Sequence, residues 1–159
     1  MATSLVGFEN IVRRARAYTN ARDSKETNEH AFEARNISVH LPAVVRDLFD
    51  NGHYSQATFE AYKFLDKEIF RHSKIAKSGF QLMMDALGGT NPAVRFTPML
   101  TISQQDEQKG FQFIFSGAVL AIRNPRGHEH SIVDDPDTCL DHLGLASMLL
   151  RRLADAGYK

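Results

Sequence analysis

The segment RNPRGHEH, residues 123–130, is the part of the sequence whose side chains are best suited to chemistry. It holds two arginines, an asparagine, two histidines and a glutamate. It directly follows an apolar stretch, GFQFIFSGAVLAI, so a rigid element is expected to end where these polar side chains begin. Loops that a rigid scaffold positions commonly carry binding and catalytic residues. The segment is therefore the candidate functional site, although its composition alone also fits a solvated loop.

Arg123 and His128 could act together on a phosphate ester. Histidine titrates near neutral pH and can therefore serve as a general base or a general acid. Arginine stays charged and can hold phosphate oxygens through two parallel hydrogen bonds. Cleavage of RNA by its own 2′-hydroxyl needs a base for the hydroxyl proton, an acid for the 5′-oxygen and a cation for the phosphorane charge. This chemistry requires no metal ion or other cofactor.

The neighbours of this pair are supporting candidates. Asn124 either hydrogen-bonds the backbone or orients His128, or it is a capping or turn residue of the kind that asparagine favours. Arg126 is equally expected to bind phosphate or to lie exposed. His130 is a candidate second acid–base group, while Glu129 is expected to be solvated or ion-paired.

Composition indicates one compact domain. The chain has 159 residues, of which 43% are hydrophobic and 24% charged, as is typical of globular proteins. The 19 Lys and Arg residues balance the 19 Asp and Glu residues, so any nucleic acid would have to be held by a local patch. The single cysteine, Cys139, excludes an internal disulfide and a multi-cysteine zinc site. A metal site of His128, His130 and His142 is a weaker alternative, because no carboxylate or cysteine spacing supports it.

The sequence also predicts a location inside the cell. The start, MATSLVGFEN, has no basic region followed by an apolar stretch and a cleavage site, so it does not resemble a secretory signal. The most apolar run, residues 111–122, is too short to span a bilayer. A cytoplasmic protein without a membrane partner is expected, which agrees with the low cysteine content.

Apolar residues recur at helical spacing, and turn residues separate the segments. Predicted helices cover residues 4–20, 40–50, 55–72, 80–87 and 103–123, and a last helix begins at Pro136. Asn51-Gly52 is a short joint, which makes the two helices around it antiparallel neighbours. The predicted fold class is all-α: an up-and-down bundle of four to five helices over residues 41–159, with a short N-terminal helical extension over residues 1–40.

The helix over residues 103–123 is expected to be the central one, because it becomes apolar nearly all round. Ser103 is its predicted N-cap, with Asp106 and Glu107 in its first turn. Pro125 is expected to break the helix, because proline fits poorly in a helix interior and disfavours helical geometry in the residue before it. The candidate site would then lie on a turn between two helices.

Three stretches of the sequence resemble a known family. GFQFIFSGAVLAIRNPRGHEH, the upstream NGHYSQATFEAYKFLDKEI and the downstream HLGLASMLLRRL resemble the Ymh-type family of uncharacterised prokaryotic proteins, over residues 41–155. More broadly, Arg123-Asn124 followed by His128 at the end of an apolar helix resembles the HEPN superfamily. The signature of that superfamily is an arginine, four to six residues and then a histidine, at the end of the third core helix.

This resemblance implies a metal-independent endoribonuclease, with Arg123 and His128 as catalytic residues and RNA as substrate. It implies a homodimer whose two motifs face one another across a shared cleft. It also implies a toxin or effector of prokaryotic defence, with an antitoxin or another defence protein as partner. Some HEPN domains place a polar cluster on an adjacent helix, for which Asp66 and Glu68 are candidates. Where some carry a modified tyrosine two residues after the histidine, this chain has His130.

Two other functions remain open. The first is a catalytically silent HEPN module that binds RNA or a protein partner inside a defence complex, since many small helical bundles act as interaction modules. The second is a helical DNA-binding or regulatory protein. The zero net charge and the lack of a clear recognition helix argue against the second.

Overall fold

Helices form most of the described part of the chain in this computed structural model, which describes residues 29–37, 40–129 and 131–158. Among these residues there is no strand, so the predicted all-α bundle is confirmed. The predicted helix over residues 4–20 lies outside the described residues. The elements are α2 (Ala31–Ala34), α3 (Ala43–Asp50), α4 (Tyr54–Ser73), α5 (Gly79–Leu87), α6 (Ile102–Ala118), the π-helical η1 (Val119–Arg123), α7 (Asn124–His128) and α8 (Pro136–Asp155).

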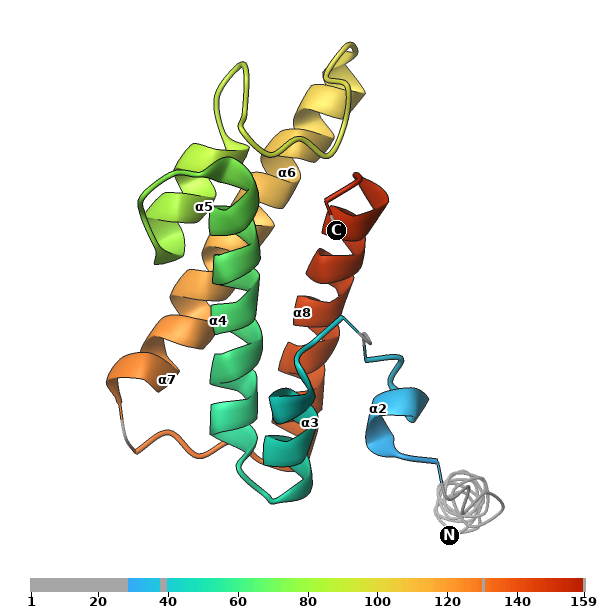
Figure 1. The fold of residues 1–159 in the computed structure, drawn as a ribbon, viewed down its shortest axis with the longest axis vertical. Helices are drawn as coiled ribbons and strands as arrows, with labels where there is room; N and C mark the ends of the chain where they lie inside the picture. The colour runs from blue at the N-terminus through green and yellow to red at the C-terminus, as the bar shows by residue number, and fades with distance from the viewer. Residues whose placement is uncertain (1–28, 38–39, 130, 159) are drawn as a thin grey trace, which may run out of the picture.

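Helix α4 occupies the middle of the bundle (Figure 1). It contacts α3, α5, α8 and η1, and its buried side chains recur every three or four residues. The Asn51-Gly52 joint places α3 beside α4 as predicted, and Gly52 adopts the left-handed conformation that ends α3. The sequence predicts an inner face of Ala57, Ala61, Phe64, Leu65, Glu68 and Ile69, of which Phe64 and Glu68 are only partly buried. The fully buried residues of this helix are Ala57, Thr58, Ala61, Tyr62, Leu65 and Ile69.

The prediction that the apolar helix before the motif is the central one is wrong. Helix α6 lies at the edge of the bundle and contacts α5 and η1. It buries Phe115, Ser116 and Ala118 but leaves Phe113 55% and Ile114 42% exposed. The side chains are apolar all round although only one face meets the core, so part of this surface remains uncovered in the single chain.

The start of α6 also differs from the prediction. The N-cap is Thr101 and not Ser103, because the Thr101 side chain accepts a hydrogen bond of 3.2 Å from the backbone N–H of Gln104. The helix begins at Ile102, and therefore Asp106 and Glu107 lie beyond its first turn. The predicted end of the preceding helix at Leu87 is confirmed, and residues 88–101 form the expected connection.

Helix continues through Pro125, where the sequence predicted a break. The segment Val119–Arg123 is π-helical, and the N–H of Asn124 donates to the carbonyl of Val119, five residues earlier. A new α-helical segment, α7, starts at Asn124, so Pro125 lies in its first turn. Proline is tolerated there, since a first-turn N–H has no partner within the helix. The motif consequently lies on a helix and not on a turn.

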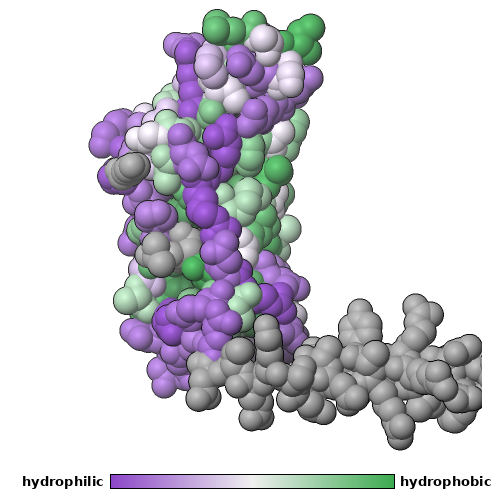
Figure 2. All heavy atoms as spheres, turned by 90° about the vertical axis from the view of Figure 1, so that its right-hand side faces the viewer, coloured by the Kyte–Doolittle hydropathy of each residue, from purple (hydrophilic) through white to green (hydrophobic). Residues whose placement is uncertain are grey.

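Helix α8 closes the bundle as predicted. Asp135 caps it, accepting a hydrogen bond of 2.9 Å from the N–H of Thr138, and Pro136 occupies its first position. The sequence places six apolar residues at helical spacing on the predicted inner face of this helix, and all six are buried. They are Cys139, Leu143, Ala146, Leu149, Leu150 and Leu153. On the face seen in Figure 2, a band of hydrophilic side chains runs along the length of the molecule. None of the described helices is long and apolar enough to cross a bilayer.

A single buried amide connects the loop between α5 and α6 to the core. The side-chain oxygen of Gln108 accepts from the N–H of Phe96 at 2.8 Å. Its amide nitrogen donates to the carbonyls of Leu87 and Val94 at 2.9 and 3.0 Å. Gln108 is fully buried. If its amide were removed, water could not reach these three backbone groups to replace its hydrogen bonds.

We expect Gln108→Leu to lower the free energy of unfolding by about 1–3 kcal/mol, because it leaves buried backbone groups without partners. The control is Lys109→Leu on the exposed side of α6, which should change stability by about 0.5 kcal/mol or less. Chemical denaturation of the two variants and the wild type measures the difference. Equal stability of all three proteins would contradict this account of the loop.

Candidate functional site

Arg123, the last residue of η1, has a half-buried side chain without an ionic partner in the described part of the chain. Its guanidinium carbon lies 5.8 Å from the centre of the Phe59 ring on α4. Its Nη1 lies close to Gly79 at the start of α5, where an added Cβ would be 3.5 Å away. The Nε atom of Arg123 is buried and has no hydrogen-bond partner among the described residues.

The unpaired state of Arg123 contrasts with the other partly buried arginines. Arg46, Arg126 and Arg152 form ion pairs, and Arg151 donates a hydrogen bond of 2.9 Å to the Asn36 carbonyl. Removing a charge from water is costly unless a counter-charge or hydrogen bonds compensate for it. The environment of Arg123 therefore fits an arginine that is completed by an anion from outside the described chain.

Asp66 of α4 lies beside Gly79, the residue that adjoins the Arg123 guanidinium. Its carboxylate is 8% exposed and accepts a hydrogen bond of 2.6 Å from the N–H of Gly79. This bond fixes the start of α5 against α4, beside the Arg123 guanidinium. Of the two carboxylates predicted for a supporting cluster, Asp66 therefore adjoins the site. Glu68 instead pairs with Arg71.

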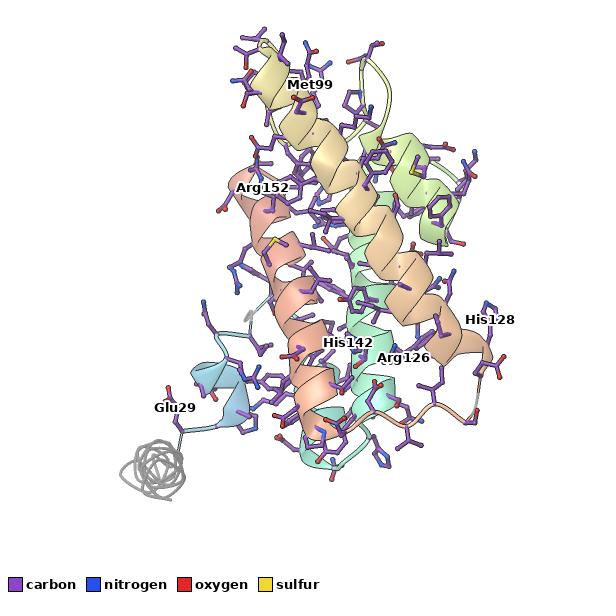
Figure 3. The ribbon with its side chains drawn as sticks, turned by 180° about the vertical axis from the view of Figure 1, so that it is seen from behind. Glu29, Met99, Arg126, His128, His142 and Arg152 are labelled. Carbon is purple, nitrogen blue, oxygen red and sulfur yellow. The ribbon has the colours of Figure 1, made fainter. Side chains whose placement is uncertain are left out.

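His128 ends α7 and is exposed, with its side chain outside the bundle (Figure 3). It makes no hydrogen bond to another described residue. Asn124 is half-buried near the beginning of the same helix, and its side chain likewise has no described hydrogen-bond partner. Neither an orienting bond to His128 nor a side-chain cap is present. Arg123, Asn124 and His128 thus share one continuous helix, with the arginine nearer the core and the histidine at the open end.

Arg126 is neither exposed nor free for phosphate, and both predictions for it need correction. Its side chain is 8% exposed and forms a two-bond ion pair with Asp134, whose side chain is 4% exposed. Its Nη1 also donates to the carbonyl of Ile122 at 2.8 Å, and its Nη2 lies 3.3 Å from Nδ1 of His142. The helix that continues through Pro125 turns this side chain inward, towards α8 (Figure 3).

His142 lies beside the Arg126–Asp134 pair. Burial lowers the pKa of His142, and the positive charge of Arg126 lowers it further. Burial raises the pKa of the Tyr62 phenol, which donates a hydrogen bond of 2.9 Å to the His142 carbonyl. Ser55 accepts from the N–H of Asp134 at 2.7 Å, which connects the segment before α8 to the start of α4. The pair therefore joins α4, α7 and α8.

A groove of about 640 Å³ lies beside the motif. We call it the motif groove, and the residues that define it here are Leu48, Gln56, Phe59, Glu60, Gly127 and Ile132. Phe59 is not among the residues predicted from the sequence, because it lies outside the most regular apolar face of α4. Gly127 approaches the Phe59 ring so closely that an added Cβ would lie 3.0 Å from it. The groove is thus continuous with the helix that carries Arg123 and His128.

The other predicted ligands are only partly tested by the geometry. His130 lies outside the described residues, and so the proposed His128, His130 and His142 metal site lies partly outside them too. Within the described ranges, no three His, Cys, Asp or Glu side chains gather in a way that could hold a metal ion. Glu129 is exposed, as expected. Burial raises the pKa of the Cys139 thiol, which disfavours a reactive thiolate in the core.

A family model described as a protein of unknown function, Hypoth_ymh, matches residues 35–153. No curated protein matches the chain, and no solved structure does. The family match covers more than half of the sequence and includes every described helix from α3 to α7 and nearly all of α8. The chain therefore belongs to the Hypoth_ymh family, which confirms the narrower of the two resemblances in the sequence.

The two histidines with lowered pKa values predict a loss of stability in mild acid. Burial lowers the pKa of both His142 and His72, so the unfolded chain takes up protons before the folded one does. The free energy of unfolding should therefore fall as the pH drops from about 7 to about 5. We expect His142→Gln to show a smaller fall over this interval, and the double variant with His72→Gln a smaller one still. Urea denaturation across the interval measures it, and an unchanged pH dependence in the double variant would disprove the assignment.

Proposed function

We propose that this member of the Hypoth_ymh family is a metal-independent endoribonuclease of the HEPN type. The observation that carries the proposal is the half-buried Arg123, which has no ionic partner within the described ranges and lies on the helix that ends at the exposed His128. An arginine in this state suits a phosphate diester, which supplies both the negative charge and the hydrogen-bond acceptors that it lacks. His128, at the open end of the helix, suits proton transfer to and from the bound RNA.

The proposed reaction uses the 2′-hydroxyl of RNA as nucleophile. One histidine removes the hydroxyl proton as the 2′-oxygen attacks phosphorus, and Arg123 stabilises the charge on the phosphorane. The bond from phosphorus to the 5′-oxygen then breaks, and a second histidine protonates that oxygen. The products are a 2′,3′-cyclic phosphate and a 5′-hydroxyl. The second histidine comes from another copy of the chain, which would give a composite site with two histidines and two arginines.

The uncovered surface of α6 supports a homodimer. Phe113, Ile114, Gly117, Leu120 and Ala121 are all exposed and recur every three or four residues along α6 and η1, and we call this set the α6 stripe. An added Cβ on Gly117 would meet no atom within 4 Å, so a neighbouring helix has room to approach there. The stripe runs towards the motif. If two copies cross near Leu120, their two motifs lie at the same end of the shared interface.

The setting that we propose is prokaryotic defence, in which the protein acts as a toxin or effector beside an antitoxin or another defence protein. The alternative is a catalytically silent HEPN module that binds RNA or a protein partner. The absence of any described hydrogen bond to His128 favours this alternative, because a general base is usually held in place by a second group. The α6 stripe would then serve as its contact surface.

Cleavage of total cellular RNA in EDTA tests the proposed activity. We expect the wild type to produce fragments that end in 2′,3′-cyclic phosphates. Arg123→Ala and His128→Ala should each lower the rate by about 100- to 1000-fold, because each removes a group that acts in the transition state. The matched control is Arg95→Ala in the loop between α5 and α6, an exposed arginine away from the motif, which should cleave like the wild type. Equal rates for wild type and His128→Ala would refute the assignment.

Growth of a host that expresses the protein separates the two functions. A ribonuclease toxin should slow growth, and His128→Ala should restore it. If the wild type slows growth and His128→Ala does so equally, the silent module is favoured over the enzyme.

Light scattering after size exclusion tests the dimer. Leu120 is 51% exposed, so Leu120→Asp should leave the fold intact, but it places a charge in the α6 stripe. We expect the wild type to be a dimer and Leu120→Asp to be a monomer without cleavage activity. Leu100→Asp is the control, since Leu100 is also an exposed leucine but lies outside the stripe. A dimer that survives Leu120→Asp would show that another surface holds the copies together.

A further inference from the structure

We infer that the motif groove is a pocket for one unpaired base of the RNA, with guanine as the preferred base. In this pocket Phe59 stacks on the base, while Gln56 and Glu60 hydrogen-bond to its edge. The inference rests on the proposed action on RNA, and it adds the residues that select the nucleotide. A pocket of about 640 Å³ is within the range of small-molecule sites and can hold a base with part of its sugar.

The position of the three residues suits a base that enters edge first. Gln56, Phe59 and Glu60 are three and four residues apart on α4, so their side chains lie on the same face of the helix. Leu48 and Ile132 supply apolar surface opposite them. Proteins that recognise unpaired RNA bases combine these two features, an aromatic ring for stacking and polar groups at the base edge. A base inside a duplex has neither its faces nor its pairing edge free.

The Phe59 ring connects this groove to the phosphate site. The Arg123 guanidinium lies 5.8 Å from the centre of the ring, and the backbone of Gly127 approaches the ring edge. Lys63 lies 5.8 Å from the same ring centre and forms an ion pair with Glu60. A nucleotide whose phosphate binds Arg123 would therefore have Phe59 beside it for its base. Stacking on the ring also aligns the bound strand relative to His128 at the end of α7.

The polar groups at the groove favour guanine. Glu60 is an acceptor, and its carboxylate now contacts Lys63 at 2.8 and 3.1 Å. The pairing edge of guanine presents two adjacent N–H donors, which match the two oxygens of one carboxylate. Adenine, cytosine and uracil each place an acceptor beside the donors on that edge, which a carboxylate repels. The amide of Gln56 has no described hydrogen-bond partner, so it is available for the O6 acceptor or the sugar.

Binding of short single-stranded RNA in EDTA tests the pocket, and His128→Ala is present in every protein so that no strand is cut. The probes are labelled oligouridines that contain one guanosine, adenosine or cytidine, and fluorescence anisotropy gives the dissociation constants. We expect the guanosine probe to bind most tightly. Phe59→Ala should weaken its binding by about 5- to 150-fold. Phe59→Tyr should keep most of the affinity, because the ring can still stack.

Two further variants make the result specific. Phe70→Ala removes a phenylalanine from the exposed side of the same helix, away from the groove, and should bind like the parent. Glu60→Gln should retain affinity for the unmodified oligouridine but lose the preference for guanosine, because a neutral amide no longer accepts two donors. Circular dichroism of each variant confirms that α4 is intact.

The outcomes separate this inference from the proposed activity. Equal RNA affinity of the Phe59→Ala and parent proteins would overturn the pocket even if the wild type cleaves RNA, and would leave the groove to a protein segment. Failure of the parent protein to bind any probe would overturn it as well. Binding that depends on Phe59 and favours guanosine would support the pocket even if the wild type cleaves nothing, in which case the ribonuclease proposal alone would fail.

Discussion

The ion pair between Arg126 and Asp134 is the interaction on which the candidate site depends. It is nearly inaccessible to water, and Arg126 also donates to the Ile122 carbonyl, while the backbone N–H of Asp134 donates to the Ser55 hydroxyl. A buried pair of this kind adds little net stability over an apolar pair, but loss of one partner would leave an uncompensated charge. Its effect is to position the candidate site, because it fixes α7 against α8 and α4. That placement holds Arg123 beside Phe59 and leaves the end of the helix open to solvent.

The π-helical segment explains how one short motif supplies both an internal and an external group. One turn of η1 changes the rotation of the helix just before the motif, and α7 then continues in α-helical geometry. Arg126 is thereby directed inward, and His128, two residues later, lies outside (Figure 3). π-Helical turns often occur at functional sites, because the extra residue alters which side chains face the core. Here it allows a motif with a central proline to remain helical.

The sequence predicted the fold better than the site, for a physical reason. The helices bounded by Asn51-Gly52 and by Asp135-Pro136 were correctly predicted, because their limits depend on local backbone preferences. Pro125 misled the prediction, since its local preference was overridden by the π-helical turn. The role of Arg126 could not be predicted, because it depends on Asp134 and on His142 of another helix. The exposed face of α6 was assigned to the core, as apolar character does not distinguish a core from an uncovered surface.

Arg123 and Arg126 lie three residues apart, but their guanidinium groups have different surroundings. Arg126 has a carboxylate, a carbonyl and a histidine around it, and every nitrogen of its guanidinium has a partner. Arg123 is half-buried against an aromatic ring and the backbone of Gly79, which offer it no full counter-charge. A folded chain gains nothing from an unpaired guanidinium in such a place, and nearby Asp66 is already engaged with Gly79. Under the proposed function, a phosphate group of the bound RNA supplies the missing counter-charge, and the energetic cost in the free protein then becomes binding energy for that group.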